Sequence, residues 1–293
     1  MNLKPITKNE RELFENFFYK HNIIMCEFNF ANLYVWGEIY KFEWTMFQNR
    51  LLIFSNYDDI IYMPQGENIS FNQLMEISDY FLSQNKSGDF MFVNPDFVED
   101  EKQNLISNFE IIPDIDDFDY VYETEKLVNL RGKKLNKKKN LISQFKRNIE
   151  NYEIRLLEKK DFKDCINLSE MWCEDKLCDK MGFNIEMEAI KSLFLKYYDI
   201  SVEGLGVFID GKLEAFSVFS KLNDNTYDIH FEKFNTQIKG LPCVINNETA
   251  KYLSDKCKYL NREQDMGLPG LRKNKRSWEP EFLVESYYLR RKK

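Results

Sequence analysis

Two side chains suited to proton transfer lie two residues apart in the C-terminal half of the chain. The segment 227–234 reads YDIHFEKF, in which apolar and polar residues alternate with the period of a β-strand that buries one face. This alternation predicts that His230 and Glu232 lie on the same face of the strand, where either could act as a general base if that face lines a cleft. Solvated polar positions on a half-buried strand would produce the same pattern.

A turn follows this strand and leads into a predicted helix. Ile238, Lys239 and Gly240 lie in the turn, and apolar residues recur at helical spacing from Val244 onward. Free backbone amides and the positive end of the helix dipole attract anions at a helix N-terminus, and Lys239 adds charge. The pattern therefore predicts a site for the phosphate groups of a donor substrate at residues 238–240. An ordinary turn before a core helix is the alternative, because the segment offers a single glycine.

Three further polar residues lie in a loop near the C-terminus. The segment 260–280 reads LNREQDMGLPGLRKNKRSWEP and contains Asp265, Arg272 and Lys275. The side chains of Arg272 and Lys275 could bind a phosphate or carboxylate group, and Asp265 is a third candidate catalytic residue. Structural roles are the alternative for all three residues, and for Asp265 that role is a loop cap.

A block of basic residues begins near residue 130. The segment 130–147 reads LRGKKLNKKKNLISQFKR, which keeps a helical apolar stripe while it concentrates positive charge. Five lysines are candidates for contacts with tRNA or with anionic lipid headgroups: Lys133, Lys134, Lys137, Lys138 and Lys139. A solvated helix face is the alternative. The net charge of −7 disfavours nonspecific coating of nucleic acid by the protein as a whole.

Other kinds of chemistry find little support in the sequence. No Ser-His-Asp or Cys-His signature is visible, so we expect direct attack by an acceptor in place of a covalent enzyme intermediate. The six cysteines, Cys173 and Cys178 among them, include no close CxxC pair, and the chain has two histidines. This predicts reduced thiols, no metal site and no tightly bound cofactor. No apolar run reaches the ~20 residues of a membrane span, and we expect a cytoplasmic protein.

The order of the predicted elements divides the chain into two similar halves. A length of 293 residues favours two domains. Each half has several consecutive strands followed by a helix, a strand, a helix and a final strand, and two additional helices precede the strands of the second half. We therefore predict an α+β protein with two tandem domains, residues 1–129 and 130–293, each with a mixed sheet flanked by helices.

The order of elements in the second half resembles the GNAT (acyl-CoA N-acyltransferase) fold. In that fold two neighbouring strands splay apart, and the turn into the next helix holds the pyrophosphate of the donor. The GNAT turn reads Gln/Arg-x-x-Gly-x-Gly/Ala. This chain has Gln237 and Gly240 followed by Pro242, which lacks the backbone amide that the usual loop supplies.

Three stretches carry a closer resemblance: FANLYVWGEIY at 30–40, LRGKKLNKKKNLISQF at 130–145 and LNREQDMGLPGLRKNKRSWEP at 260–280. With the order of elements, they resemble the family named for the C-terminal domain of phosphatidylglycerol lysyltransferase, whose members have two fused GNAT-like domains. The named enzymes transfer an aminoacyl group from a charged tRNA to a membrane lipid and carry a multi-helix membrane domain, which we do not expect here. The resemblance implies an acyl- or aminoacyltransferase, with aminoacyl-tRNA or acyl-CoA as co-substrate and an amine or hydroxyl as acceptor.

Two alternatives stay open. The first is a Fem-type aminoacyltransferase that builds peptidoglycan bridges, because those enzymes also use paired GNAT-like domains. The second is a non-catalytic GNAT scaffold that serves as a sensor or binding protein, which Pro242 and the missing catalytic signature would fit.

Overall fold

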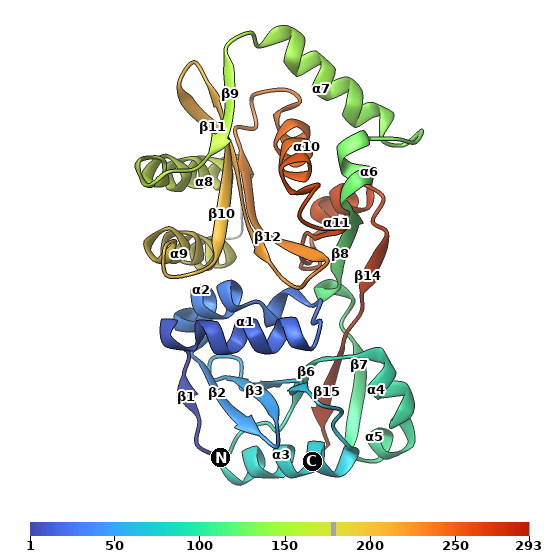
Figure 1. The fold of residues 1–293 in the computed structure, drawn as a ribbon. Coiled ribbons are helices and arrows are strands. Elements are labelled where there is room, and N and C mark those ends of the chain that lie inside the picture. Colours follow the sequence, from blue (N-terminus) through green and yellow to red (C-terminus); the bar gives the residue numbers. More distant parts are fainter. Residues whose placement is uncertain (177–179, 293) are drawn as a thin grey trace. The chain divides into compact units, whose positions relative to one another are not determined.

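The structure is a computed structural model that describes residues 1–176 and 180–292, and the chain forms two compact units (Figure 1). Unit 1 comprises Met1–Asp119, Gln264–Leu268 and Val284–Lys293. Unit 2 comprises Tyr120–Glu263 and Pro269–Leu283. Each unit therefore contains segments that are far apart in the sequence.

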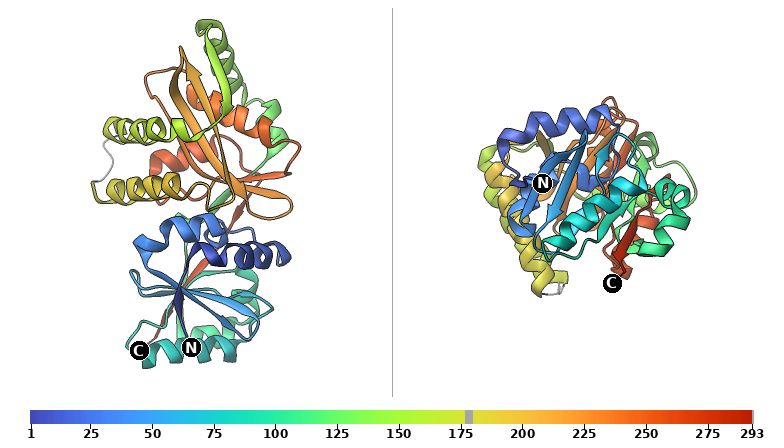
Figure 2. Two further views of the ribbon diagram at one scale, coloured as in Figure 1. Left: turned by 60° about the vertical axis from the view of Figure 1, so that its left-hand side comes forward. Right: turned by 90° about the horizontal axis from the view of Figure 1, so that it is seen from below.

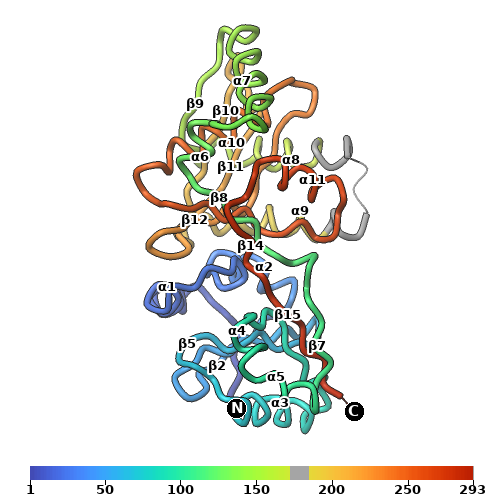
Figure 3. Tube along the Cα trace, turned by 90° about the vertical axis from the view of Figure 1, so that its right-hand side faces the viewer, coloured from blue at the N-terminus to red at the C-terminus, as the bar shows by residue number. Residues whose placement is uncertain are grey.

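The boundaries of the units differ from the predicted ranges of 1–129 and 130–293 because strand pairing joins distant segments. β8 (Asp119–Glu123) pairs antiparallel with β13 (Tyr259–Asn261) in unit 2. β15 (Tyr287–Arg291) pairs with both β6 and β7 in unit 1, as Figure 3 shows for β7. Periodicity within a strand carries no information about its partners, so the sequence pattern could not reveal this exchange of segments.

The sheet of unit 1 has the strand order β1-β2-β3-β4-β6-β15-β7, with β5 beside β3. Its other strands are β1 (Lys4–Pro5), β2 (Phe42–Phe47), β3 (Arg50–Ser55), β4 (Ile60–Tyr62), β5 (Gln65–Gly66), β6 (Phe90–Val93) and β7 (Phe109–Pro113). Gln48 and Asn49 both have positive φ and close the predicted β2–β3 hairpin. β4 and β6 run parallel, whereas neighbours such as β2 and β3 or β3 and β4 are antiparallel, so the sheet is mixed.

Short helices accompany this sheet. They are η1 (Lys8–Glu10), α1 (Arg11–Lys20), η2 (Cys26–Phe28), α2 (Phe30–Tyr40), α3 (Phe71–Ser83), α4 (Pro95–Asp100), α5 (Lys102–Asn108) and η3 (Ile115–Asp117). Ser70 and Gln73 form the predicted capping box of α3, and Asn94 caps α4 ahead of Pro95. The predicted helix starts are therefore confirmed at α3 and α4.

The sheet of unit 2 has the strand order β14-β8-β13-β12-β11-β10-β9. Its other strands are β9 (Tyr152–Leu156), β10 (Val202–Ile209), β11 (Lys212–Lys221), β12 (Thr226–Phe234) and β14 (Phe282–Val284). Asp210 and Gly211 have positive φ and close the predicted β10–β11 hairpin. β12 and β13 run parallel, whereas β9 to β12 are antiparallel.

Helices cover both faces of the unit 2 sheet, as Figure 2 shows. They are α6 (Thr124–Asn129), α7 (Asn136–Asn148), η4 (Lys159–Asp161), α8 (Phe162–Lys176), α9 (Lys180–Lys196), α10 (Leu241–Leu253) and α11 (Pro269–Arg276). Phe216 of β11 contacts Phe194 of α9 on one face. Phe219 of the same strand packs on the other face in a core with Val244 of α10 and Phe145 of α7. One face of the sheet is thus covered by α9 and the other by α10, and side chains of β11 point to both.

Candidate active site

β12 and β13 separate at their carboxyl ends. They pair through three residue pairs, and the last of these joins Asp228 to Asn261, where β13 ends. β12 continues beyond this point to Phe234. The pairing therefore ends where the predicted divergence of the two strands would begin. Ligands of open α/β sheets bind at the carboxyl ends of strands that separate, so this opening is the candidate active site.

A β-bulge in β12 decides which side chains face the opening. Val218 of β11 pairs with Phe231, whereas the next residue, Phe219, pairs with Ile229. His230 is therefore the extra residue on β12. A bulge of this kind interrupts the regular alternation of side chains between the two faces of a strand.

The bulge overturns the predicted arrangement of the catalytic candidates. Glu232 pairs with Ser217, and Asp228 pairs with Ser220. Directly paired residues share a face, and Ser217 and Ser220 point to opposite faces because they lie three positions apart in β11. The ring of His230 lies on the Ser220 side, with Nε2 2.8 Å from the hydroxyl. The prediction that His230 and Glu232 share one face is wrong.

Arg262 bridges the opening on the α10 face. Its Nη2 donates to Oε1 of Glu232 at 3.0 Å, and both side chains are 14% exposed. The amide of Asn246 in α10, assigned with its oxygen toward Arg262, accepts from Nη1 at 2.6 Å. The guanidinium also lies 5.7 Å from the ring of Tyr122 and 5.8 Å from that of Trp278. A paired carboxylate and guanidinium thus occupy the gap between the strands.

Lys138 of α7 extends this positive charge. Its Nζ lies 4.5 Å from the ring centroid of Trp278. Burial lowers the pKa of Lys138, and repulsion from Arg262 and Lys137 acts in the same direction. Burial raises the pKa of the nearby Cys243 thiol, which keeps this thiol protonated at neutral pH. Among the five predicted basic-patch lysines, Lys138 is therefore the one that joins the opening.

On the opposite face, His230 lies among groups from β11, β12 and the end of β13. Its Nδ1 is 3.5 Å from Oδ2 of Asp228 and 3.6 Å from Oε1 of Glu263. The side chains of His230 and Asp228 are buried, whereas that of Glu263 is 25% exposed. Ser220, Asp228 and Glu263 are not among the site residues predicted from the sequence. The one sequence feature that points to this group is that Asp228 and His230 lie two residues apart.

Several amides of the turn before α10 are already hydrogen-bonded. The amides of Ile238, Leu241 and Cys243 donate to carbonyl groups within residues 235–240, at 2.9–3.3 Å. Pro242 has no amide to offer. Amide donors are therefore occupied at residues 238, 241 and 243, which weakens the geometric basis of the phosphate site at 238–240, and this site stays a prediction.

Gly240 makes close contact with α7. It is buried with φ 88°, and a Cβ added there would lie 2.6 Å from the carbonyl oxygen of Leu141. Ile238 packs against the core of unit 2, while Lys239 is exposed. The structure thus favours the alternative of a core turn at Gly240, and it leaves Lys239 as an exposed cation beside it.

Lys275 and Arg272 lie on α11. Lys275 is buried, and its Nζ donates to the carbonyl oxygen of Glu263 at 3.0 Å and to that of Arg262. Tyr122 donates through its hydroxyl to the Lys275 carbonyl oxygen at 2.8 Å. Lys275 therefore holds the loop after β13, which is the structural role that the sequence left as the alternative to binding an anion. Arg272 is half-buried in the same helix.

Asp265 belongs to unit 1, whereas His230 and Glu232 belong to unit 2. Asp265 is buried, and its Oδ1 accepts from the amide of Gly267 at 3.0 Å. This is the geometry of the loop cap that the sequence left as the alternative.

The predicted basic helix forms α7 and the turn that precedes it. No acidic residue occurs between 130 and 149. Lys134 pairs with Glu279 at 3.2 Å. Lys133, Lys137 and Lys139 are exposed, and no ion pair involves them within residues 1–176 and 180–292. Lys137 and Lys139 of α7, with Lys133 just before the helix, thus present a positive surface next to Lys138, whereas Lys146 of α7 pairs with Glu248 at 3.5 Å.

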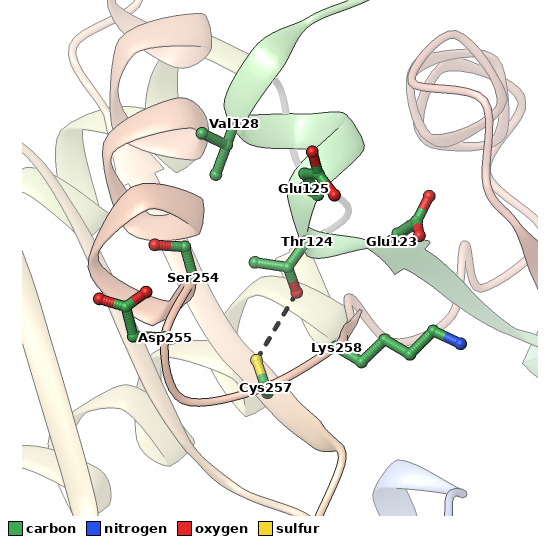
Figure 4. A pocket seen from close by; sticks show the side chains of 8 residues that line it. All are labelled: Glu123, Thr124, Glu125, Val128, Ser254, Asp255, Cys257 and Lys258. Atoms are coloured by element: carbon green, nitrogen blue, oxygen red, sulfur yellow. Dashed lines mark hydrogen bonds between the residues drawn. The ribbon is translucent and has the colours of Figure 1, made fainter.

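A separate hollow of about 480 Å³ lies at the other end of β13, between α6 and the end of α10 (Figure 4). In it the thiol of Cys257 lies 3.6 Å from the hydroxyl of Thr124. Its lining also carries three carboxylates and one cation: Glu123, Glu125, Asp255 and Lys258. This acidic lining does not suit a phosphate donor, so we place the active site at the opening of β12 and β13.

Cys178 lies outside the described residues, as does the side chain of Cys173. Cys26, Cys165, Cys243 and Cys257 form no disulfide within the described part of the chain. Within the described part of the chain, no helix combines the length and the hydropathy needed to cross a membrane.

Comparisons with known proteins identify the fold. A conserved protein of unknown function from Bacteroides thetaiotaomicron has a TM-score of 0.93 at 26% identity, with complete coverage of both chains. L-PGS from Bacillus licheniformis has a TM-score of 0.66 at 12% identity, over 96% of this chain and 91% of that one. FemX has a TM-score of 0.64 at 10% identity, over 98% and 97%. The two units are thus tandem GNAT-like domains, and the predicted α+β class with mixed sheets and flanking helices is confirmed.

The family described as "Phosphatidylglycerol lysyltransferase, C-terminal" matches residues 23–290. The chain belongs to this family, as its three motif stretches predict. MYCGA3080 of Mycoplasmoides gallisepticum is 24% identical over 176 residues, which cover 58% of this chain and 55% of that protein. The match thus spans about half the length of this curated relative.

Proposed function

We propose that the protein is an aminoacyltransferase of the cytoplasm that takes its aminoacyl group from a charged tRNA and transfers it to an amine or a hydroxyl. The observation that carries this proposal is the Arg262–Glu232 pair in the opening between β12 and β13, next to Lys138 and the basic helix α7. The family and the likeness to L-PGS and FemX support the class of enzyme.

The charge distribution of unit 2 favours a polyanionic donor. Exposed lysines of α7 would contact backbone phosphates, as cations on protein surfaces do with nucleic acids. Lys138 and Arg262 continue this charge into the opening. A tRNA held on α7 would therefore place its 3′ end near Glu232.

Two features favour aminoacyl-tRNA over acyl-CoA as the donor. The amides of Ile238 and Leu241 bond to carbonyl groups of the turn and Pro242 has none, so the turn has fewer donors for a pyrophosphate than the usual GNAT loop. The exposed residues Lys133, Lys137 and Lys139 form an extended basic surface, which suits the many phosphates of a tRNA better than the short phosphate arm of acyl-CoA.

The pair in the opening has the groups that acyl transfer requires. In the proposed reaction the acceptor nitrogen or oxygen attacks the ester carbonyl of the aminoacyl group, and the bond to the ribose oxygen breaks. Glu232 takes the acceptor's proton and returns a proton to the ribose oxygen. Arg262 stabilises the oxyanion of the tetrahedral intermediate. His230 lies on the other face of the sheet, so we assign it no proton transfer in this step.

A second candidate function is a non-catalytic tRNA-binding protein. The observations that favour it are the full engagement of Arg262 by Glu232 and Asn246 and the packing of Gly240 against α7. A binding protein would use the basic surface of α7 and need no chemistry in the opening.

The test is transfer of a labelled aminoacyl group from charged tRNAs to a panel of acceptors: phosphatidylglycerol vesicles, a peptidoglycan precursor and simple amines, with acetyl-CoA as a parallel donor. Glu232→Gln should lower the transfer rate by about 10²–10⁴-fold with tRNA affinity unchanged. Glu248→Gln, which removes a carboxylate from α10, is the matched control. Binding without transfer would select the second candidate, and transfer from acetyl-CoA alone would exclude a tRNA donor.

A further inference from the structure

We propose that Asp228, His230 and Glu263 form a binding site for a divalent transition-metal ion. Each residue offers one ligand atom, and these atoms lie within 4.8 Å of one another. The site lies on the Ser220 side of the sheet, whereas Glu232 pairs on the other side. It is therefore distinct from the proposed transfer site, and it departs from the expectation of a metal-free protein.

The strongest indication is an unsatisfied nitrogen. Nδ1 of His230 is buried and has no hydrogen-bond partner among the described residues. If Nδ1 carries a proton, the oxygens of Asp228 and Glu263 at 3.5 and 3.6 Å are too distant for good hydrogen bonds. If Nδ1 is unprotonated, its lone pair faces two carboxylates. A cation between the three atoms would give Nδ1 a partner, since buried polar groups are normally hydrogen-bonded or bound to metal.

The distances suit an ion of the size of Zn²⁺. Ligand atoms about 2.1 Å from an ion at tetrahedral angles lie roughly 3.4 Å apart. The observed separations from Nδ1 of His230 are 3.5 Å to Asp228 and 3.6 Å to Glu263. Binding would therefore require only small side-chain movements.

The backbone around the site adopts unusual geometry that directs these side chains. His230 is the extra residue of the β-bulge, and bulges re-aim side chains next to functional sites. Glu263 has φ 56°, which is uncommon for a residue other than glycine. Three hydrogen bonds hold it there: its amide donates to Asn261, and its carbonyl oxygen accepts from Lys275 and Tyr120.

The set of donors selects the class of metal. One imidazole and two carboxylates suit Zn²⁺, Co²⁺ or Mn²⁺ better than Mg²⁺ or Ca²⁺, which prefer more ligands and oxygen alone. Ser220 lies 2.8 Å from Nε2 of His230, so it can accept the other ring proton and leave Nδ1 free to bind metal. The partial exposure of Glu263 provides a path from solvent and room for a fourth ligand.

The test uses Co²⁺ added to the full-length protein after dialysis against a chelator. Visible absorption reports the coordination geometry, and a thiolate charge-transfer band would reveal binding to cysteine instead. We expect one Co²⁺ per chain without that band. Asp228→Asn and Glu263→Gln should each weaken binding at least 10-fold, and Glu248→Gln, a carboxylate of α10 outside the cluster, should leave it unchanged.

Glu263→Gln keeps the test valid if Asp228→Asn does not fold, because Glu263 is partly exposed; circular dichroism checks both variants. Absence of Co²⁺ and Zn²⁺ binding by the wild-type protein would overturn the proposal. So would binding that is unaffected by both variants, or a spectrum dominated by thiolate.

Discussion

The proposed docking of tRNA on α7 makes a quantitative prediction about salt dependence. Lys133, Lys137 and Lys139 are exposed and have no ion pairs within the described residues. If each contacts one phosphate, the triple substitution to glutamine should reduce the slope of log K against log salt by about 2–3. Between 50 and 200 mM salt, the wild-type affinity should therefore fall by a factor about 20–40 larger than that of the variant.

Filter binding with charged and uncharged tRNA at several salt concentrations measures this slope. The matched control replaces Lys159, Lys160 and Lys163 with glutamine, which changes the charge by the same amount near the start of α8. The control should keep the wild-type slope. Equal slopes for all three proteins would refute the assignment of α7 as the docking surface, and an equal reduction in both variants would show that only net charge matters.

Three further predictions concern stability. Gly240→Ala should lower the free energy of unfolding by about 1–3 kcal/mol, because the added Cβ would contact the α7 backbone and the residue has positive φ. Gly270→Ala in α11 should not destabilise the protein, and denaturant titration compares the two variants. Arg262→Met should lower the free energy of unfolding by about 2–3 kcal/mol, because it leaves the largely buried Glu232 carboxylate without its partner. Adding Glu232→Gln should recover part of this loss, and additive losses of the two substitutions would show that the residues are not coupled. Burial and repulsion from Asp114 raise the pKa of Asp117 to about 7, so the folded state holds a proton there that the unfolded state loses above about pH 4. Stability should therefore fall as pH rises from 4 to 7, and Asp117→Asn should remove at least about 1 kcal/mol of that fall; an unchanged pH profile would contradict the shift.

The elements of the fold were largely predictable, because they depend on local signals. Capping boxes and hairpin turns mark their own positions, as at Ser70 and at Asp210–Gly211. The assignment of β8 to unit 2 and β15 to unit 1 depends on pairing between residues more than 130 apart, such as Leu260 with Tyr122. No periodicity within either strand encodes that choice of partner.

The candidate site was predictable only in part. The sequence pointed to the opening between two strands and to Glu232, but a single bulge turned His230 to the other face. Arg262 was missed because nothing about its position, directly after a short strand, distinguishes it from a surface arginine. Asn246 looks like a polar helix residue until the fold brings it against that guanidinium. Such contacts between distant residues become visible only in three dimensions.

The central claim is that the aminoacyl end of a charged tRNA enters the opening between β12 and β13. The direct measurement is a crystal structure of the protein with a minihelix RNA that carries a non-hydrolysable aminoacyl group. The account predicts the aminoacyl carbonyl within hydrogen-bond distance of Arg262 and Glu232, with the RNA backbone on α7. An aminoacyl group bound elsewhere, such as in the hollow beside Cys257, would contradict it.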